Sequence, residues 1–153
     1  MTAVADRLAE LGLELPPVAK PVAAYVPAVV TGNLVFTAGQ LPFVSGTLSA
    51  TGKFGGELAA EDGAALARIC VLNALAAAES VIGSLDRVTR VVKVVAFVAS
   101  TPDFTGQPGV ANGASELLGQ IFGDAGQHAR SAVGVPVLPL DAPVEVELVL
   151  EFA

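Results

Sequence analysis

The stretch 130-RSAVGVPVLPLDAPVEVE-147 is typical of two apolar strands joined by a turn that prolines bound on both sides. Side chains alternate between the two faces of a strand, so Arg130, Ala132 and Gly134 share one face of the first strand. In the second strand, Glu145 and Glu147 share a face, and valine and leucine side chains occupy the other. The pattern predicts a buried sheet with one arginine beside an unusually small-residue face.

Arg130 is far in sequence from any other lysine or arginine. It is the only lysine or arginine in the sixty residues after Lys93, a stretch that also holds seven carboxylates. One interpretation is a structural salt bridge to a strand glutamate. The other is a clamp for a ligand carboxylate, because a guanidinium presents a planar fork of donors that lysine cannot copy. If the last two strands are neighbours, Glu145 or Glu147 lies near Arg130, and the turn length does not decide which.

The remaining segments alternate between helix and strand patterns. We expect a helix over residues 3–12, a hairpin of strands 26–30 and 34–37, and a glycine-rich loop over 43–56. A helix over 60–82, a strand over 87–99, a helix from Thr101 to about Phe122 that Pro108 interrupts or restarts, and strands 130–135 and 144–152 follow. This order favours an α+β fold in which two long helices cover one face of a mixed sheet. We find no linker, so residues 1–153 are predicted to form a single domain, with residues 1–17 as a helical N-terminal extension.

Composition restricts the partners. Apolar residues make up 53% of the chain and charged residues only 15%, which favours an oligomer that covers part of its apolar surface. A net charge of −7 and the lack of a basic cluster oppose nucleic-acid binding. We also expect no membrane span, because no apolar run approaches the required length of roughly 20 residues. The single cysteine suits a reducing cytoplasm.

Other residue types with chemical potential are few. His128 is the sole histidine and has no second ligand at metal-binding spacing, so we expect a loop role and no metal site. Cys70 falls within a helix and is interpreted as inert packing. Three further residues each have a structural interpretation and an interpretation as part of a ligand site. They are Tyr25 beside the hairpin, Gly39 at a turn, and Asn112, whose side chain either serves the helix backbone or lines a site.

Four segments together resemble a known family: 34-LVFTAGQLP-42, 73-NALAAAESVIG-83, 90-RVVKVVAFVAS-100 and 130-RSAVGVPVLPLDAPVEVE-147. They are similar to the RidA/YjgF family of imine deaminases, from about Tyr25 to the C-terminus. The resemblance implies a chorismate-mutase-like α+β fold that assembles as a homotrimer with sites between protomers. It also implies that reactive enamines or imines, such as 2-aminoacrylate, are hydrolysed to 2-oxo acids and ammonia without a cofactor.

The resemblance assigns roles to particular residues. Arg130 matches the arginine that binds the substrate carboxylate, and Glu145, rather than Glu147, matches the glutamate that holds the attacking water. The substrate-binding positions that it implies are Tyr25, Gly39, Asn112 and Ala132. Two positions depart from the common pattern, because Ala38 replaces a serine and Ala132 replaces a cysteine.

Two alternatives to imine hydrolysis follow from the same residues. One is a non-catalytic trimeric module that binds small carboxylate metabolites in the same cleft. The other is ribonuclease activity, a label attached to some relatives, which the acidic charge opposes. Packing alone does not explain a small-residue face beside a lone arginine, so a purely structural role is the weakest interpretation.

Overall fold

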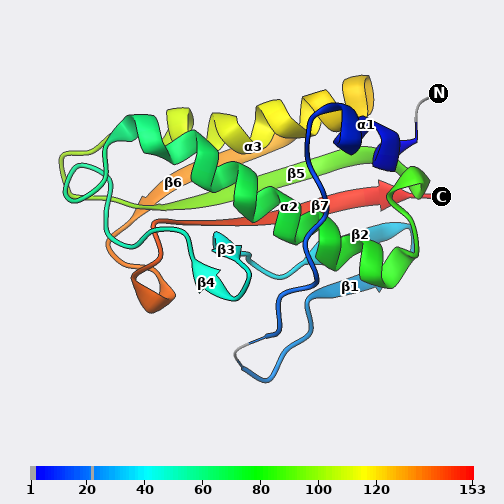
Figure 1. The fold of residues 1–153 in the computed structure, drawn as a ribbon, viewed down its shortest axis with the longest axis horizontal. Coiled ribbons are helices and arrows are strands. Elements are labelled where there is room, and N and C mark those ends of the chain that lie inside the picture. Colours follow the sequence, from blue (N-terminus) through cyan, green and yellow to red (C-terminus); the bar gives the residue numbers. More distant parts are fainter. Residues whose placement is uncertain (1–2, 22) are drawn as a thin grey trace.

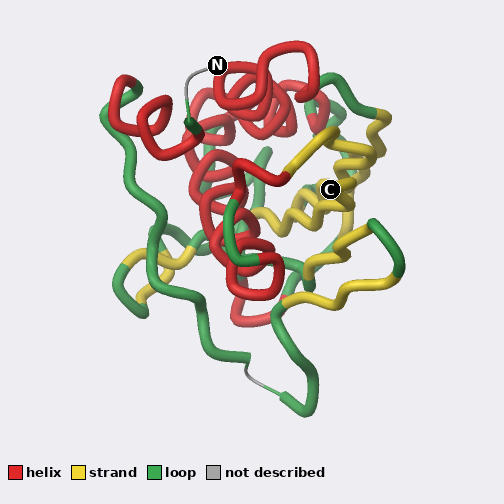
Figure 2. Tube along the Cα trace, turned by 90° about the vertical axis from the view of Figure 1, so that its right-hand side faces the viewer, coloured by secondary structure: helices red, strands yellow, loops and turns green. Residues whose placement is uncertain are grey.

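The computed structural model describes residues 3–21 and 23–153 as two layers, with the long helices α2 (Gly63–Ile82) and α3 (Gln107–Phe122) on one face of a mixed sheet (Figure 1). The view turned by 90° places these helices to one side and the strands of the five-stranded sheet to the other (Figure 2). The α+β class predicted from the sequence is therefore confirmed.

The elements follow the expected order. The other helical segments are α1 (Val4–Glu10) and the 3-10 turns η1 (Ala60–Asp62), η2 (Leu85–Arg87), η3 (Gly123–Gly126) and η4 (Pro139–Asp141). The strands are β1 (Ala28–Thr31), β2 (Leu34–Thr37), β3 (Phe43–Val44), β4 (Thr47–Leu48), β5 (Val88–Ala99), β6 (Ala129–Val135) and β7 (Val144–Phe152). The hairpin around Gly32, which has φ 58°, joins β1 to β2 as predicted.

The main sheet has the strand order β1-β2-β7-β5-β6 in the described part of the chain. β6 runs parallel to β5, and β7 runs antiparallel to β5 on its other side. The last two strands, β6 and β7, are therefore not neighbours, and the condition under which Glu145 or Glu147 was expected near Arg130 is wrong. A parallel pair needs a crossover through a helix, here α3, so β6 becomes an edge strand and β5 separates it from β7.

The core lies between the sheet and the two helices. Val94, Ala96 and Val98 of β5 are fully or almost fully buried, and so are the alternate residues of β7. Several α2 alanines have no exposed surface. The helices approach each other closely, because a Cβ on Gly113 of α3 would overlap the backbone of Ala64 in α2.

The start of α3 differs from the expectation. The helix begins at Gln107, not at Thr101, and Pro108 lies in its first turn. Residues 101–104 instead form a turn in which the Phe104 amide donates to the Thr101 carbonyl at 3.1 Å. Proline lacks an amide hydrogen and is tolerated in the first turn of a helix, so Pro108 marks the beginning of α3 and does not interrupt it.

The N-terminal extension packs on the helix layer. Only Val4–Glu10 is helical in it, and α1 buries Leu8 in the core. The Arg7 Nε donates to the Gln120 carbonyl of α3 at 2.8 Å, and the Val4 amide donates to the Asp86 carboxylate at 2.7 Å. Because these contacts span the chain, the extension is an integral part of the fold.

One helix passes a length and composition test for a membrane span, contrary to the sequence expectation. The segment Ala60–Ile82 contains an 18-residue window with a mean hydropathy of 1.7. However, 61% of that window is buried inside the fold. Since its apolar face is already covered by the sheet and α3, we interpret it as a core helix.

Candidate active site

Arg130 lies on β6 and points toward α3. Its pairing with Val94 places it on the face that the helices cover. The Arg130 Nη1 donates to Asn112 Oδ1 at 2.8 Å and to Ser115 Oγ at 3.2 Å. Asn112 and Ser115 are one turn apart on α3, so both side chains reach the same nitrogen. The structure therefore brings together two of the predicted site residues, Arg130 and Asn112.

Arg130 is not part of a structural salt bridge in the described residues, 3–21 and 23–153. The one ion pair within 4.0 Å there joins Arg7 to Glu10 at 3.0 Å. Both groups that hold the Arg130 guanidinium are uncharged. The interpretation of Arg130 as the partner of a strand glutamate is therefore wrong, and its positive charge remains available to a ligand anion.

Glu145 occupies the opposite face of the sheet. It pairs with Phe97, whereas the buried Val144 and Val146 on either side of it face the helices. Arg130 pairs with Val94, three positions earlier on β5. Because side chains alternate, an odd separation places Arg130 and Glu145 on different faces. One protomer therefore does not bring these two predicted catalytic residues together.

Gly39 makes room for the Glu145 carboxylate. A Cβ at position 39 would overlap the Glu145 side chain. The neighbouring Gln40 exchanges two backbone hydrogen bonds with Val146, at 2.9 and 3.0 Å, which fixes residues 39 and 40 beside β7. The backbone at Gly39 is thus approached closely by a carboxylate of the same chain, a role that the sequence did not distinguish from a turn.

The environment of Glu145 favours its protonated form. Burial raises the pKa of Glu145, and the nearby negative charge of Glu147 raises it further. A carboxyl group with a raised pKa exchanges a proton near neutral pH more readily than an exposed glutamate does. Burial thus gives the Glu145 carboxylate a higher proton affinity than an exposed glutamate has.

Tyr25 lies beside the same segment. It is 48% exposed and lines a small hollow together with Gly39, Gln40 and Leu41. Asn73 of α2 holds this segment, because its Nδ2 donates to the Leu41 carbonyl at 3.2 Å and to the Phe43 carbonyl at 3.0 Å. Tyr25, Gly39 and Glu145 therefore form a second group of predicted residues, separate from Arg130 and Asn112. The sequence signal for this supporting role is a polar residue, Asn73, within the otherwise apolar stretch 69–78 of the predicted helix.

The small-residue face beside Arg130 is partly filled. Ala132 pairs with Ala96 and packs against the core, so its side chain faces the helix layer. At Gly134, the Gln107 amide occupies the space that a side chain would take. The space in front of the guanidinium lies instead toward a hollow of about 390 Å³ lined by Ser115, Gly119, Gly126, Gln127, His128 and Arg130.

His128 has two hydrogen-bond partners that its position in the sequence did not predict. Its Nε2 lies 2.8 Å from Ser115 Oγ, and its Nδ1 lies 2.6 Å from the Gly126 carbonyl oxygen. Cys70, by contrast, is fully buried, and burial raises the pKa of its thiol, as the inert-packing interpretation requires. The described residues contain no group of three or more His, Cys, Asp or Glu side chains that could hold a metal ion.

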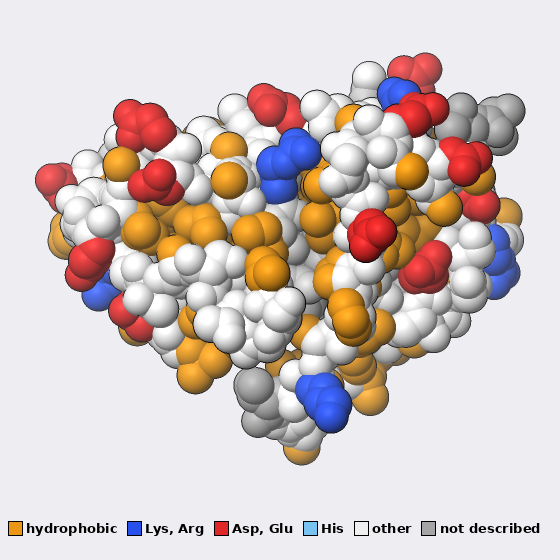
Figure 3. All heavy atoms as spheres, viewed as in Figure 1, with side chains coloured by type: hydrophobic (Ala, Val, Ile, Leu, Met, Phe, Trp, Pro, Cys, Tyr) orange, Lys and Arg blue, Asp and Glu red, His pale blue; other side chains and the backbone are white. Residues whose placement is uncertain are grey.

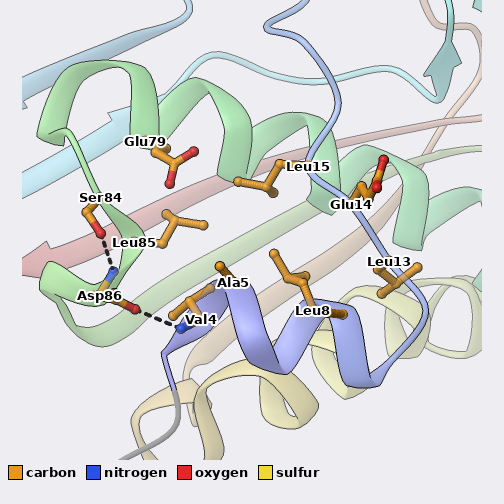
Figure 4. A pocket seen from close by; sticks show the side chains of 11 residues that line it. Val4, Ala5, Leu8, Leu13, Glu14, Leu15, Glu79, Ser84, Leu85 and Asp86 are labelled. Atoms are coloured by element: carbon orange, nitrogen blue, oxygen red, sulfur yellow. Dashed lines mark hydrogen bonds between the residues drawn. The ribbon is translucent and has the colours of Figure 1, made fainter.

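A separate cavity of about 370 Å³ lies between α1, the end of α2 and η2 (Figure 4). Its floor is apolar, with Leu8 and Leu85, and its polar groups include the carboxylates of Glu14, Glu79 and Asp86. A carboxylate ligand would meet only like charge there. This cavity is therefore separate from the hollow at Arg130.

Known proteins resemble this chain in sequence and in fold. The family model described as YjgF/chorismate mutase-like, putative endoribonuclease, matches residues 5–152. Protein TCP17 of Trypanosoma cruzi is 46% identical over 151 residues, covering 97% of this chain and 93% of that protein.

Two solved structures are also similar over nearly their full length. A protein of unknown function from Agrobacterium tumefaciens is 40% identical, with a TM-score of 0.91 over 98% of this chain and 92% of that one. A protein from Shewanella oneidensis, described as a putative endoribonuclease, is 33% identical, with a TM-score of 0.95 over 99% and 100%. The chain therefore belongs to the YjgF/chorismate mutase-like family, as its motifs predicted.

Proposed function

We propose that this protein hydrolyses small reactive imines or enamines of 2-amino acids, of the 2-aminoacrylate type, to 2-oxo acids and ammonia. One observation carries the proposal: the charge of Arg130 is held by the uncharged Asn112 and Ser115, with no carboxylate paired to it in the described chain. A fixed cation of this kind binds a small carboxylate ligand. The reaction needs no cofactor.

Arg130 would bind the carboxylate of the substrate. Charge-assisted hydrogen bonds from a guanidinium are shorter and stronger than neutral ones, and two of them fix the orientation of a planar carboxylate. The adjacent C=N carbon then has a defined position relative to the protein. Such positioning is a major source of rate enhancement, since it replaces the search of a freely diffusing reactant.

Glu145 would hold and activate water. The water oxygen bonds to the carbon of the protonated imine, the nitrogen takes the electron pair of the C=N bond, and Glu145 accepts the proton that the water loses. Glu145 then returns that proton to the nitrogen of the carbinolamine, the C–N bond breaks to release ammonia, and the hydroxyl oxygen gives its proton to solvent water as it becomes the carbonyl of the 2-oxo acid. The raised pKa of Glu145 suits both proton transfers.

We propose that neighbouring protomers of a homotrimer complete each site. Arg130 and Glu145 lie on opposite faces of the sheet in one protomer, so a site that uses both draws them from two copies. The face without helices exposes apolar side chains, including Val29, Phe36 and Val133 at 53%, 44% and 46%. Apolar surface of this kind favours association.

The family description also contains the word endoribonuclease. The net charge of −7 opposes binding to a phosphate backbone. On the helix face, lysine and arginine side chains appear singly among acidic ones and form no stripe (Figure 3). We therefore favour a small carboxylate substrate over RNA, and propose a cytoplasmic protein without membrane or nucleic-acid partners.

The decisive experiment measures catalysis and binding together. Imines are generated in situ from L-amino acids by an amino-acid oxidase, and the formation of 2-oxo acid is followed with and without the protein. Arg130→Ala is expected to lose the acceleration, and Arg130→Lys to regain little of it, because lysine lacks the fork. Equal rates for wild type and Arg130→Ala would refute the proposal. Calorimetric binding of 2-oxobutyrate without any acceleration would instead support the non-catalytic binding module.

A further inference from the structure

The hollow in front of Arg130 contains a chain of three hydrogen bonds. The Arg130 Nη1 lies 3.2 Å from Ser115 Oγ, Ser115 Oγ lies 2.8 Å from His128 Nε2, and His128 Nδ1 lies 2.6 Å from the Gly126 carbonyl oxygen. Arg130, Ser115 and His128 are each half-buried. The chain therefore links the proposed substrate-binding cation to the backbone of η3 through two side chains.

The chemistry of these groups fixes the direction of each bond for a neutral imidazole. A carbonyl oxygen can only accept, so the proton of the ring is on Nδ1 and is donated to Gly126. Nε2 is then an acceptor, and the Ser115 hydroxyl donates to it. The lone pairs of Ser115 Oγ remain free to accept from the Arg130 Nη1, which has no acceptor capacity of its own.

The far end of this chain is held rigidly. Gly126 is buried, and a Cβ there would overlap the backbone carbonyl of Leu118 in α3. Gly126, whose carbonyl accepts from His128, thus lies directly against the same helix that carries Ser115. Two fixed points, one in η3 and one in α3, determine where the Ser115 hydroxyl points.

We propose that Ser115 and His128 are positioning residues that select which edge of the Arg130 guanidinium meets the substrate; this inference rests on the proposed function. The Nη1 of Arg130 carries two hydrogens, and Asn112 Oδ1 and Ser115 Oγ accept one each. The edge formed by Nε and Nη2 is left for the substrate. The carboxylate therefore binds side-on to Arg130, and the hydroxyl–imidazole pair keeps the side chain from rotating.

The first test separates positioning from catalysis. Ser115→Ala removes the acceptor, so the Kd for 2-oxobutyrate and the KM for imines should each rise roughly tenfold, while kcat stays within about twofold. His128→Ala should have the same or a smaller effect. The double variant should be no worse than Ser115→Ala, because His128 acts through Ser115. Additive losses, or a loss in kcat alone, would overturn the inference.

Two controls match these variants. Ser115→Thr keeps the hydroxyl and should restore most of the affinity. Glu116→Gln changes an exposed side chain next to Ser115 on α3 that neither lines the hollow nor takes part in the hydrogen-bond chain, so its Kd should stay within about twofold of wild type. A tenfold loss in Glu116→Gln would show that any change in this part of α3 weakens binding, and would refute the specific role of the Ser115–His128 pair.

The second test needs no activity. His128 is the only histidine, so the nitrogen resonances of the ring are unambiguous in a ¹⁵N-labelled protein. We expect the Nδ1–H tautomer in the wild type and a shift toward Nε2–H in Ser115→Ala. An Nε2–H tautomer in the wild type would overturn the inference. If the wild type neither binds 2-oxobutyrate nor accelerates imine hydrolysis, the proposed function fails, and the tautomer still decides whether the hydrogen-bond chain exists.

Discussion

Mixing two inactive variants tests whether each site draws on two protomers. Arg130→Ala lacks the clamp, and Glu145→Gln lacks the acid–base group. Each is expected to be inactive alone. The sheet separates these residues, because β5 lies between their strands and they occupy opposite faces. A site between protomers therefore takes Arg130 from one copy and Glu145 from the next.

The size of the recovery follows from this arrangement. In a closed ring assembled at random from equal amounts of the two variants, a site is intact when its arginine comes from a Glu145→Gln chain and its glutamate from an Arg130→Ala chain. Every trimer that contains both variants has one such pairing among its three sites, so about one third of the wild-type activity per site should return in mixed trimers. A site contained within one protomer would regain nothing, since every chain carries one defect.

The assay uses co-expressed chains with two different affinity tags, purified in succession so that only mixed oligomers are measured. The imine-hydrolysis rate is compared with that of wild-type protein prepared in the same way. Mixing each variant with an inactive chain that carries both substitutions provides the control, because no intact site can form. Activity at background level in the mixed oligomers would refute the shared site, even if both single variants are inactive.

Three further outcomes follow from local contacts. Gly39→Ala places a Cβ against the Glu145 carboxylate, so kcat should fall roughly 10- to 100-fold while the circular-dichroism spectrum is unchanged; full activity would contradict the role assigned to Gly39. Gly113→Ala should destabilise the fold by roughly 1–3 kcal/mol in urea unfolding, because its Cβ would overlap Ala64, whereas Gly119→Ala on the same helix meets nothing within 4 Å and should stabilise it by up to about 1 kcal/mol. Burial raises the pKa of Glu145, so the folded state binds more protons than the unfolded state between the two pKa values, and stability falls as pH rises through that window. Glu145→Gln should therefore raise the Tm at neutral pH, with the difference fading below about pH 4; an unchanged Tm at both pH values would argue against the burial of Glu145.

Local patterns predicted most of the fold. The hairpin turn, the alanine-rich helix and the alternation in strand 130–135 each depend on neighbouring residues, and each is confirmed. The start of α3 was mispredicted, because Pro102 and Pro108 both suit a first turn and tertiary contacts decide between them. The sequence pattern also did not predict which strands are neighbours, because that depends on where the crossover helix returns the chain to the sheet.

The candidate site was predicted only in part, because contacts between segments far apart in the sequence bring its residues together. Arg130 is conspicuous in the sequence because it is the only lysine or arginine after Lys93, but its partners come from α3. The spacing of Asn112 and Ser115 was a usable signal, since residues three apart lie on one helix face and can reach a common group. The role of His128 left no such signal, because its orientation depends on the Gly126 carbonyl packed against α3.

The hydrophobic pattern of β7 is what keeps Arg130 and Glu145 apart. Moving β7 by one residue relative to β5 would bring Glu145 to the face on which Arg130 lies. The same shift would turn Val144, Val146, Leu148 and Leu150, all of which have at most 1% exposed surface, away from the helices. Each of these side chains contributes roughly 1.5–3 kcal/mol by its burial, so that register is inaccessible to a folded protomer. A single copy of the chain therefore has a stable core only with its clamp and its carboxylate on opposite faces, and their joint use in catalysis requires a second copy.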